Sequence, residues 1–375
     1  MAVLGDIEPV LDLPLGQDPD PDEFVQAAMR WHFGPDTGSP YWLDRAKTLD
    51  FDPRADVKTF EDLALFPNTV NELRDVRAED LIPRGYGGRA KVIGVFESGG
   101  TTGAPKRVVF LDDWQRRSIA WTHRNLDAHG VPRDVNWLGV VPTGPHMIGR
   151  FLVQQAEERG GIGFTIDMDP RWVKKLIAAG KADEAGGYAD HLVEQAGHLL
   201  RTQDIGVLMT TPPMLERLAR NEELVELVNA KVRAIVWGGA HLDADTRQLL
   251  RTEVFPGVTL YGNYGSTMIL GGTTERLADA DSGSAAGSAD LCVFDTYSPY
   301  ITFSVVDPET GRPVGYGERG QVVMNHVSRS ALLPNNLERD NATRIEGPAG
   351  QVGDSVADVT PVATFDNEAV IEGVY

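Results

Sequence analysis

The chain has 375 residues, of which 42% are hydrophobic and 24% charged, values typical of a soluble globular protein with one large domain or two domains. Its 35 Lys and Arg residues against 55 Asp and Glu residues give a formal charge of −20, which argues against nucleic acid and anionic membrane as general partners. The single cysteine, Cys292, excludes an internal disulfide framework and a zinc site built from several cysteines.

The first part of the chain resembles neither a leader nor an anchor. Residues 1–22 are acidic and rich in proline and lack the positively charged start of a signal peptide. No apolar run approaches the roughly 20 residues that a membrane helix needs. We therefore expect a cytoplasmic protein. Short helices are expected over residues 22–32 and 68–74.

Strands, loops and helices alternate between residues 92 and 262. We expect strands over residues 92–96, 107–110, 137–141, 162–166, 205–209, 232–237 and 258–261, the first two forming a hairpin. Helices are expected over residues 112–128 (capped by Asp112 or Asp113), 188–201, 213–220 and 243–253 (capped by Asp243). This alternation indicates an α/β fold with a mostly parallel sheet flanked by helices, in which ligands bind outside the carboxyl ends of the strands.

The pattern changes after residue 270. Residues 279–289 are rich in Ser, Ala, Gly and Asp and are expected to form a mobile loop. Residues 301–306 and 321–326 are expected to pair as a hairpin. The segment from residue 338 onwards has few apolar runs and no helical period. The sequence therefore predicts an α/β core with an acidic tail over residues 1–270, and a small β subdomain with a tail over residues 271–375.

The most informative segment is a glycine-rich loop at residues 98–106. Its residues are Ser98, Gly99, Gly100, Thr101, Thr102, Gly103, Ala104, Pro105 and Lys106. Glycines let backbone N–H groups turn toward a phosphate, and the hydroxyls and the ammonium group add donors. The loop lacks the Walker A pattern and is followed by a strand rather than a helix. A flexible hairpin turn is the alternative reading.

At all nine positions this loop matches the phosphate-binding signature of the acyl- and aryl-CoA synthetase, adenylation-domain and luciferase superfamily, so the chain resembles these adenylate-forming enzymes. Three further segments resemble this superfamily in the expected order: Trp237-Gly238-Gly239-Ala240, the run from Tyr261 to Met268, and Leu337-Glu338-Arg339-Asp340. The resemblance implies the fold of the large N-terminal domain, ATP as substrate, and release of pyrophosphate as a carboxylic acid becomes an acyl-adenylate.

The resemblance also implies roles for individual residues. Thr101, Thr102 and Lys106 would hold the β- and γ-phosphates, and Thr267 the α-phosphate. Tyr264 would stack on the adenine and Asp340 would bind the ribose, with Asp354 as the competing ribose ligand. The nucleotide-binding set is Ser98, Gly99, Gly100, Thr101, Thr102, Gly103, Lys106, Gly239, Ala240, Asn263, Tyr264, Gly265, Ser266, Thr267 and Asp340.

The acid would bind near a second strand end. In the superfamily, a His or aromatic residue at the position of His146 lines the acid pocket, which would also include Trp237 and Gly238. The alternative for His146 is a histidine satisfied by backbone carbonyls at a Pro/Gly turn. The catalytic candidates are therefore Thr267, Lys106 and His146.

The first third of the chain narrows the resemblance. Residues 41–45, 59–63 and 65–69 are similar to the start of phenylacetate-CoA ligases, which favours an aromatic acid. The compact length resembles the stand-alone adenylating proteins of phenazine antibiotic pathways, which implies a role in secondary metabolism. Acyl-protein synthetases of bioluminescence have a similar length, but nothing here matches their acyl-accepting cysteine, and Cys292 is expected to be buried.

Two departures from the superfamily pattern bear on catalysis. Met268 stands where a glutamate normally ligates Mg²⁺, so the metal ligand is unknown; phosphates with water, or nearby Glu275, are the alternatives. The chain leaves no room after Asp340 for the mobile C-terminal lobe that carries a catalytic lysine. Taken as a whole, the resemblance predicts ATP-dependent adenylation of an acid, with CoA, a carrier protein or an amine as acceptor of the acyl group. A separate lobe protein as partner, or a binding module without turnover, is the alternative.

Overall fold

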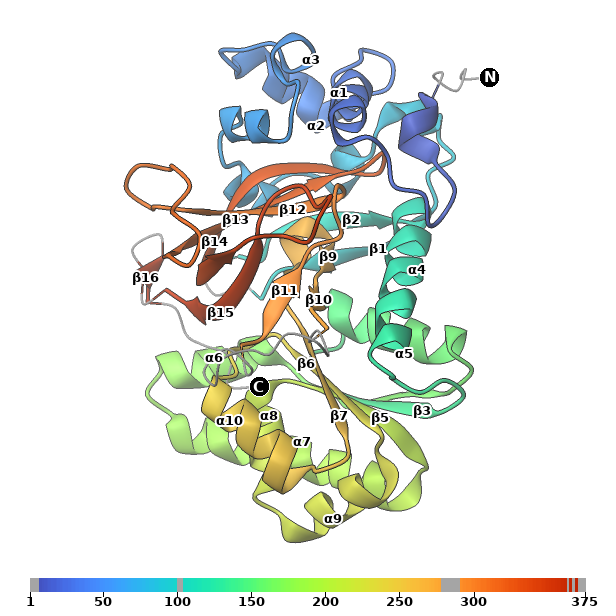
Figure 1. Ribbon diagram of the computed structural model, residues 1–375, viewed down its shortest axis with the longest axis vertical. Helices are drawn as coiled ribbons and strands as arrows, with labels where there is room; N and C mark the ends of the chain where they lie inside the picture. Colours follow the sequence, from blue (N-terminus) through green and yellow to red (C-terminus); the bar gives the residue numbers. More distant parts are fainter. Residues whose placement is uncertain (1–6, 100–103, 278–290, 363, 366–367, 370–375) are drawn as a thin grey trace.

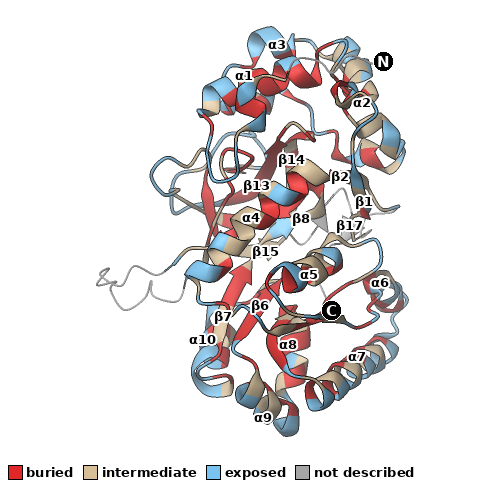
Figure 2. Ribbon diagram, turned by 90° about the vertical axis from the view of Figure 1, so that its right-hand side faces the viewer, coloured by how far each residue is buried: buried red, intermediate tan, exposed pale blue. Residues whose placement is uncertain are grey.

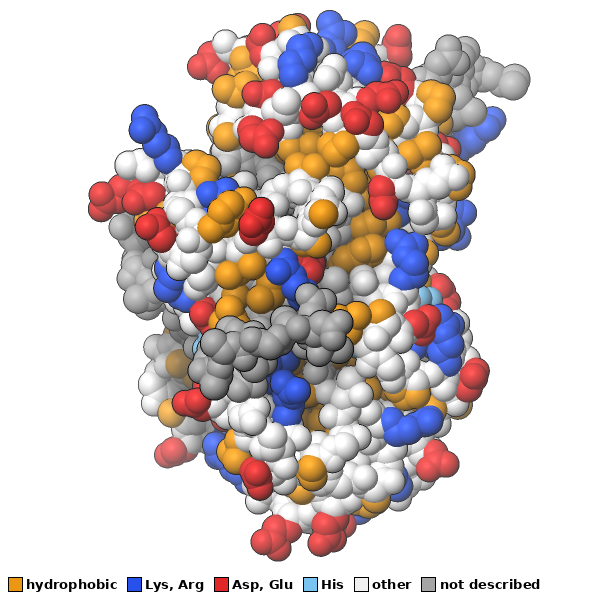
Figure 3. Space-filling model, in the orientation of Figure 1, with side chains coloured by type: hydrophobic (Ala, Val, Ile, Leu, Met, Phe, Trp, Pro, Cys, Tyr) orange, Lys and Arg blue, Asp and Glu red, His pale blue; other side chains and the backbone are white. Residues whose placement is uncertain are grey.

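The computed structural model describes residues 7–99, 104–277, 291–362, 364–365 and 368–369. A parallel five-stranded sheet with its helices forms one part of the molecule, and an antiparallel six-stranded sheet with the amino-terminal helices forms the other (Figure 1). Hydrophobic side chains are visible across the middle of the face in Figure 3, and acidic side chains are frequent toward its upper and lower ends.

The parallel sheet has the strand order β4-β3-β5-β6-β7. Its strands are β3 (Asn136–Val140), β4 (Gly163–Thr165), β5 (Ile205–Thr210), β6 (Ala234–Gly238) and β7 (Thr259–Asn263). The central strands β5 and β6 are buried almost throughout, as β6 illustrates in Figure 2, and this is expected when helices cover both faces of a parallel sheet. The predicted α/β class and its parallel sheet are confirmed.

Seven helices of the described chain accompany this sheet. They are α4 (Asp112–Ala128), α5 (Met147–Glu158), α6 (Pro170–Ala178), α7 (Ala182–Thr202), α8 (Pro212–Ala219), α9 (Glu222–Lys231) and α10 (Ala244–Leu249), the last continued by a π turn, Leu250–Val254. Helix α5 covers the sheet face that carries Trp137 and Gly139, since a Cβ at Gly139 would lie 2.5 Å from Leu152. Trp137, Val236 and Tyr261 share that face in one cluster.

The antiparallel sheet has the order β10-β11-β15-β14-β13-β12. Its strands are β10 (Thr274–Glu275), β11 (Val293–Asp295), β12 (Ile301–Val306), β13 (Arg319–Val327), β14 (Leu332–Ile345) and β15 (Ser355–Pro361). The expected hairpin is present as β12 and β13. Residues beyond 338 continue the sheet, because β13 pairs with one edge of β14 and β15 with the other. Their polar sequence gave no strand signal. Two further pairs are β8 (Gly265–Ser266) with β9 (Gly271–Gly272), and β16 (Thr364–Phe365) with β17 (Glu368–Ala369).

The amino-terminal helices pack on the antiparallel sheet. They are α1 (Pro21–His32), α2 (Pro40–Arg45) and α3 (Pro53–Asp56), with short 3-10 turns at Pro9–Asp12, Ala46–Thr48, Glu61–Leu65, Val70–Arg74, Ala78–Leu81 and Arg84–Tyr86. Trp31 Nε1 donates to the carbonyl of Arg329 at 2.9 Å, and Trp42 Nε1 to that of Leu332 at 3.0 Å. The expected helix at residues 22–32 is confirmed, whereas the one at 68–74 is a 3-10 turn.

The hairpin of β1 (Val92–Glu97) and β2 (Arg107–Leu111) leads directly into α4, as predicted. The expected cap was wrong: Leu111 is the N-cap, and neither aspartate caps the helix. The carboxylate of Asp113 accepts hydrogen bonds from Ser330 Oγ at 2.5 Å and Arg329 Nε at 3.0 Å. Asp113 therefore joins α4 to the loop after β13.

Within the described residues, no helix combines the length and the apolar character that crossing a membrane requires. Residues 279–289, expected to form a mobile loop, lie outside the described residues.

Two buried histidines predict how stability depends on pH. Burial lowers the pKa of both His32 and His326 to about 4. Between pH 6.5 and 4 the unfolded chain therefore binds protons that the folded chain does not, so the free energy of unfolding decreases as pH falls through this window. Each histidine contributes roughly 3 kcal/mol to this loss at its lower end.

Urea unfolding measured from pH 7 to 4 checks this expectation. H326Q is expected to reduce the slope of unfolding free energy against pH by about one proton, whereas H198Q, a change at the exposed surface of α7, should leave the slope unchanged. An H326Q slope equal to that of the unmodified protein would contradict the assignment.

Candidate functional site

A large pocket opens at the carboxyl ends of the parallel strands, with a cavity volume of about 420 Å³. Its wall includes residues from all four segments singled out in the sequence, as far as these are described. These lining residues are Ser98, Gly99, Lys106, Trp237, Gly238, Gly239, Ala240, Asn263, Tyr264, Gly265, Ser266, Thr267 and Asp340. Gly100, Thr101, Thr102 and Gly103 lie outside the described residues. Segments more than 240 residues apart in the chain therefore meet around one cavity, as Ser98 and Asp340 illustrate.

The base of the glycine-rich loop is closed by two hydrogen bonds. Ser98 N–H donates to the carbonyl of Lys106 at 3.0 Å, and Lys106 N–H donates to Ser98 Oγ at 3.1 Å. Glu97, just before the loop, accepts from Arg107 at 2.9 Å and from Arg171 at 2.7 Å. Partial burial acts to raise the pKa of Glu97, but the hydrogen bonds of both arginines lower it below its usual value. The glycine-rich loop therefore begins next to a charged carboxylate that two arginine side chains hold in place.

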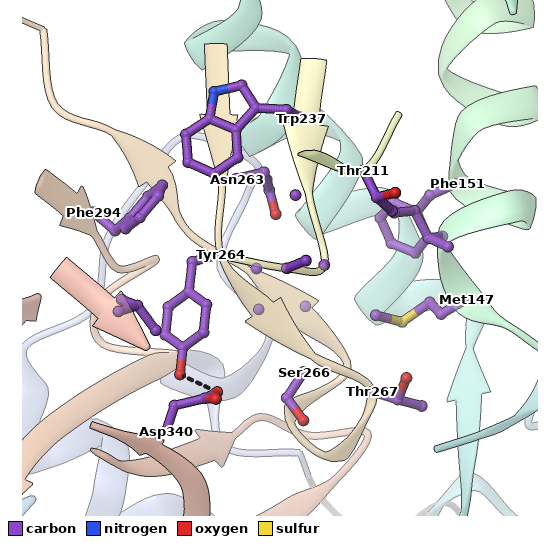
Figure 4. A pocket seen from close by; sticks show the side chains of 18 of the residues that line it. Met147, Phe151, Thr211, Trp237, Asn263, Tyr264, Ser266, Thr267, Phe294 and Asp340 are labelled. Atoms are coloured by element: carbon purple, nitrogen blue, oxygen red, sulfur yellow. Dashed lines mark hydrogen bonds between the residues drawn. The ribbon is translucent and has the colours of Figure 1, made fainter. Parts of the chain in front are cut away.

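Tyr264 and Asp340 form the side of the pocket next to the antiparallel sheet. Tyr264 Oη donates to Asp340 Oδ2 at 2.9 Å (Figure 4), and the ring lies 5.9 Å from that of Phe294. Burial and then the charge of Asp340 raise the pKa of Tyr264, so its phenol stays protonated and donates. Strand β14 carries Asp340 to this position.

The competing aspartate lies elsewhere. Asp354 is only 4% exposed, and its carboxylate accepts from Arg344 Nε at 2.9 Å and from the N–H of Val305 at 3.1 Å. It is not among the lining residues. Of the two ribose candidates, Asp340 alone faces the pocket.

The turn after β6 needs both of its glycines. A Cβ at Gly238 would lie 2.5 Å from the carbonyl oxygen of Asn263, and Gly239 has a φ of +81°, a conformation that side chains disfavour. The turn therefore runs against β7. Trp237 lies on the face opposite Val236, with its ring 6.1 Å from Phe294 and its Nε1 buried without a hydrogen-bond partner.

A short turn presents Thr267 to the cavity. Ser266 Oγ accepts from the N–H of Met268 at 3.2 Å and so begins a 3-10 turn over Thr267–Ile269. The hydroxyl of Thr267 makes no hydrogen bond with any described residue and points into the pocket (Figure 4). Asn263 Nδ2 donates to the carbonyl of Thr273 at 2.9 Å, which fixes its amide.

The residues near this turn do not fit a protein-held Mg²⁺. Met268 is 4% exposed and offers only a thioether, a poor ligand for a hard cation. Glu275, the alternative ligand, has its carboxylate bound by Arg247 and by the N–H of Gly262. Among the described residues no group of three or more His, Cys, Asp and Glu side chains gathers around a common point.

His146 lines the pocket at the start of α5. Burial, and next the charge of Arg171, lower its pKa to about 4, so the imidazole is neutral near pH 7. Its ring makes no hydrogen bond with the described part of the chain, which argues against the reading of a histidine satisfied by backbone carbonyls. A neutral imidazole can orient a carboxylate by one hydrogen bond, but it supplies no positive charge.

Several lining residues escaped the sequence analysis. One part of the lining, here called the apolar branch, consists of residues from α4, β3, α5 and the segment before β12: Trp114, Trp121, Trp137, Phe151, Gln155 and Tyr297. Cys292, expected to be buried, is partly exposed and lines the other side of the pocket. Thr211, at the end of β5, has a buried and unpartnered Oγ1. The aromatic residues gave no sequence signal, since aromatic residues in strands and helices more often belong to the core.

Comparisons with known proteins agree with this geometry. Residues 188–328 match a family model described as AMP-binding enzyme. No curated protein sequence matches the chain. Among solved structures, the chain is similar to 2-hydroxyisobutyryl-CoA ligase in complex with 2-HIB-AMP and CoA in the thioesterification state. The sequence identity is 17% and the TM-score 0.64, over 94% of this chain and 70% of the ligase.

Two further states of that ligase give similar values. The postadenylation state with 2-HIB-AMP has 16% identity and a TM-score of 0.62, over 93% of this chain and 69% of the ligase. The open conformation with 2-HIB-AMP and CoA has 16% identity and a TM-score of 0.61, over 91% and 68%. Similarity at such identities shows the fold: the chain has the α/β fold of the large domain of adenylate-forming ligases, as predicted.

Proposed function

We propose that this chain, which has the fold of adenylate-forming ligases and matches the AMP-binding family over residues 188–328, activates a carboxylic acid with ATP and releases pyrophosphate. The observation that carries the proposal is the convergence of four separate segments on one pocket. A phosphate-type loop, a glycine turn, an uncommitted threonine hydroxyl and a Tyr264–Asp340 pair border a cavity with an apolar branch.

In the proposed reaction a carboxylate oxygen attacks the α-phosphorus, and pyrophosphate leaves from the opposite side. Catalysis then consists of positioning both partners and stabilising charge on the phosphoryl oxygens. Thr267 would donate to an α-phosphate oxygen, and Lys106 would neutralise the β- and γ-phosphates. Asp340 would accept from the ribose, and neutral His146 would orient the acid by one hydrogen bond.

The metal and the acceptor belong to the same proposal. Because Met268 and Glu275 offer no available carboxylate, Mg²⁺ would enter with ATP, held by phosphates and water. CoA, a carrier protein or an amine would take the acyl group. The resemblance to phenylacetate-CoA ligases and the aromatic lining of the deep branch support an aromatic acid and a place in secondary metabolism.

One observation favours a second candidate. The position at which the superfamily carries its metal-ligating glutamate is a buried methionine, Met268. This would suit a module that binds a nucleotide or an acyl-adenylate without turnover, or one half of a split ligase that works with a separate partner protein.

Acid-dependent exchange of labelled pyrophosphate into ATP, measured over a panel of aryl acids, separates these candidates. Exchange by the isolated chain supports the proposed ligase. ATP binding without exchange supports the module, and exchange that requires a second protein supports a split enzyme. The double variant K106A/T267A is expected to lose most of its ATP affinity by equilibrium binding, and an affinity equal to that of the unmodified chain would overturn the nucleotide site.

A further inference from the structure

The aromatic rings of the apolar branch lie next to the segment that follows the Thr267 turn. Trp114 Nε1 donates to the carbonyl of Leu270 at 2.8 Å, and a Cβ at Gly271 would lie 3.9 Å from the Trp114 ring. The Tyr297 ring stacks on Trp114 with centroids 5.9 Å apart and on Trp121 with centroids 4.8 Å apart. These flat rings therefore continue from the segment expected to hold the α-phosphate into the branch.

The inner end of this branch contains two buried polar atoms without partners. Trp137 is 1% exposed and Gln155 is 4% exposed, and both line the pocket. Trp137 Nε1 and Gln155 Oε1 have no hydrogen-bond partner. Leaving a buried donor or acceptor unsatisfied is costly, so such atoms in a cavity indicate a ligand group that completes them.

Other polar atoms of the same wall are satisfied within the protein. The Oη of Tyr261 donates to Thr274 Oγ1 at 3.0 Å, and the hydroxyls of Ser118 and Thr122 donate within α4 at 3.0 and 2.9 Å. Trp114 Nε1 is also paired, as described above. Thr211 Oγ1 and Trp237 Nε1 also lack a partner, but they lie at the ends of β5 and β6, whereas Trp137 and Gln155 come from β3 and α5.

The wall also limits the charge of what it binds. No Asp, Glu, Lys or Arg is found among the described lining residues that come from β3, α4 and α5. A charged group there would be buried without a counter-charge, which is strongly disfavoured. Trp137 donates and Gln155 Oε1 accepts, and a hydroxyl is a small uncharged group that does both.

The depth of the branch limits the length of the ligand. Trp137 lies three residues before Val140, the last residue of β3, which places it about 10 Å below the carboxyl edge of the sheet. A ligand that reaches from the Thr267 turn to Trp137 is longer than one benzene ring with its carboxylate.

We infer that the acid bound here is a flat aromatic acid of two or more rings that carries a hydroxyl at the end opposite its carboxylate. Apart from the carboxylate this acid is uncharged, and Gln155 and Trp137 recognise its hydroxyl. The inference rests on the proposed function for the identity of the ligand as an acid. Gln155 and Trp137 are specificity-determining residues, distant from the reacting atoms.

Equilibrium binding of 6-hydroxy-2-naphthoic acid and of 2-naphthoic acid, in the presence of a non-hydrolysable ATP analogue, tests the inference. The unmodified chain is expected to bind the hydroxylated acid roughly 10- to 100-fold more tightly. Q155L and W137F should each reduce this preference to within a few-fold. Q154L is the matched control: Gln154 precedes Gln155 on α5, but its amide donates to Glu158 at 2.6 Å and does not line the pocket. It should keep the full preference.

Thermal unfolding of each variant verifies that it is folded. Q155L and W137F alter different residues, so each tests the recognition of the hydroxyl independently. Equal binding of both acids, binding of neither acid beside normal ATP binding, or a preference that survives in folded Q155L and W137F would each overturn the inference. Pyrophosphate exchange is scored separately. If the chain prefers the hydroxylated acid but catalyses no exchange, the proposed adenylation is overturned and the recognition of the hydroxyl stands. If the chain catalyses exchange without preferring the hydroxylated acid, the adenylation stands and the recognition is overturned.

Discussion

Replacing Thr267 with valine is expected to lower the rate of acid-dependent pyrophosphate exchange by roughly 100- to 1000-fold, the range seen when one fixed donor to a developing negative charge is removed. Valine keeps the shape of threonine and deletes only the hydroxyl. Because that hydroxyl has no partner among the described residues, its removal breaks no bond there. The thermal unfolding midpoint should therefore stay close to that of the unmodified chain.

The same substitution on the surface provides the control. Thr202 ends α7, and its hydroxyl donates to the carbonyl of His198 at 2.8 Å, far from the pocket lining. T202V should leave exchange unchanged. An exchange rate in T267V within threefold of the unmodified chain would remove Thr267 from the reaction.

The second large effect concerns stability. The Arg247–Glu275 pair is buried beside the pocket, which Arg247 helps to line, and its side chains are 6% and 11% exposed. Replacing Arg247 with leucine would leave the Glu275 carboxylate buried without its cation, and we expect the free energy of unfolding to fall by about 3–5 kcal/mol. Urea unfolding measures this loss.

The double variant R247L/E275L is expected to recover much of that free energy, since an apolar pair replaces the buried charges. Recovery should be incomplete because the N–H of Gly262, which donates to Glu275 at 2.7 Å, loses its acceptor. The exposed pair Arg201–Glu223 is the contrast, and R201L should change stability little. A small loss in R247L, comparable with that in R201L, would contradict the importance of the buried pair.

Local patterns in the sequence were sufficient for much of the α/β part. Strands such as β5 and β6 are short apolar runs followed by Pro or Gly, so burial and turn chemistry are both visible in consecutive residues. The hairpin around the glycine-rich loop and the Asp243 cap of α10, whose carboxylate accepts from the N–H of Thr246 at 2.9 Å, were predicted for the same reason. Each of these features depends on residues a few positions apart.

Features that depend on distant partners were not predicted. The polar half of β14 is a strand because β13 and β15 supply its hydrogen bonds, and Asp113 binds Arg329 and Ser330 instead of capping α4. Glu275 was a reasonable metal candidate until the fold brought Arg247 to it. None of these pairings has a local signature.

The sequence by itself predicted a phosphate-binding loop, because such a loop needs its glycines, hydroxyls and lysine in one short stretch. Only the tertiary structure decided that Asp340 rather than Asp354 faces the pocket, and that the buried residues Gln155 and Trp137 are among those that line it. The physical reason is that a pocket consists of space left between elements. The residues that border it are chosen by packing over long sequence separations, which periodicity and local chemistry do not record.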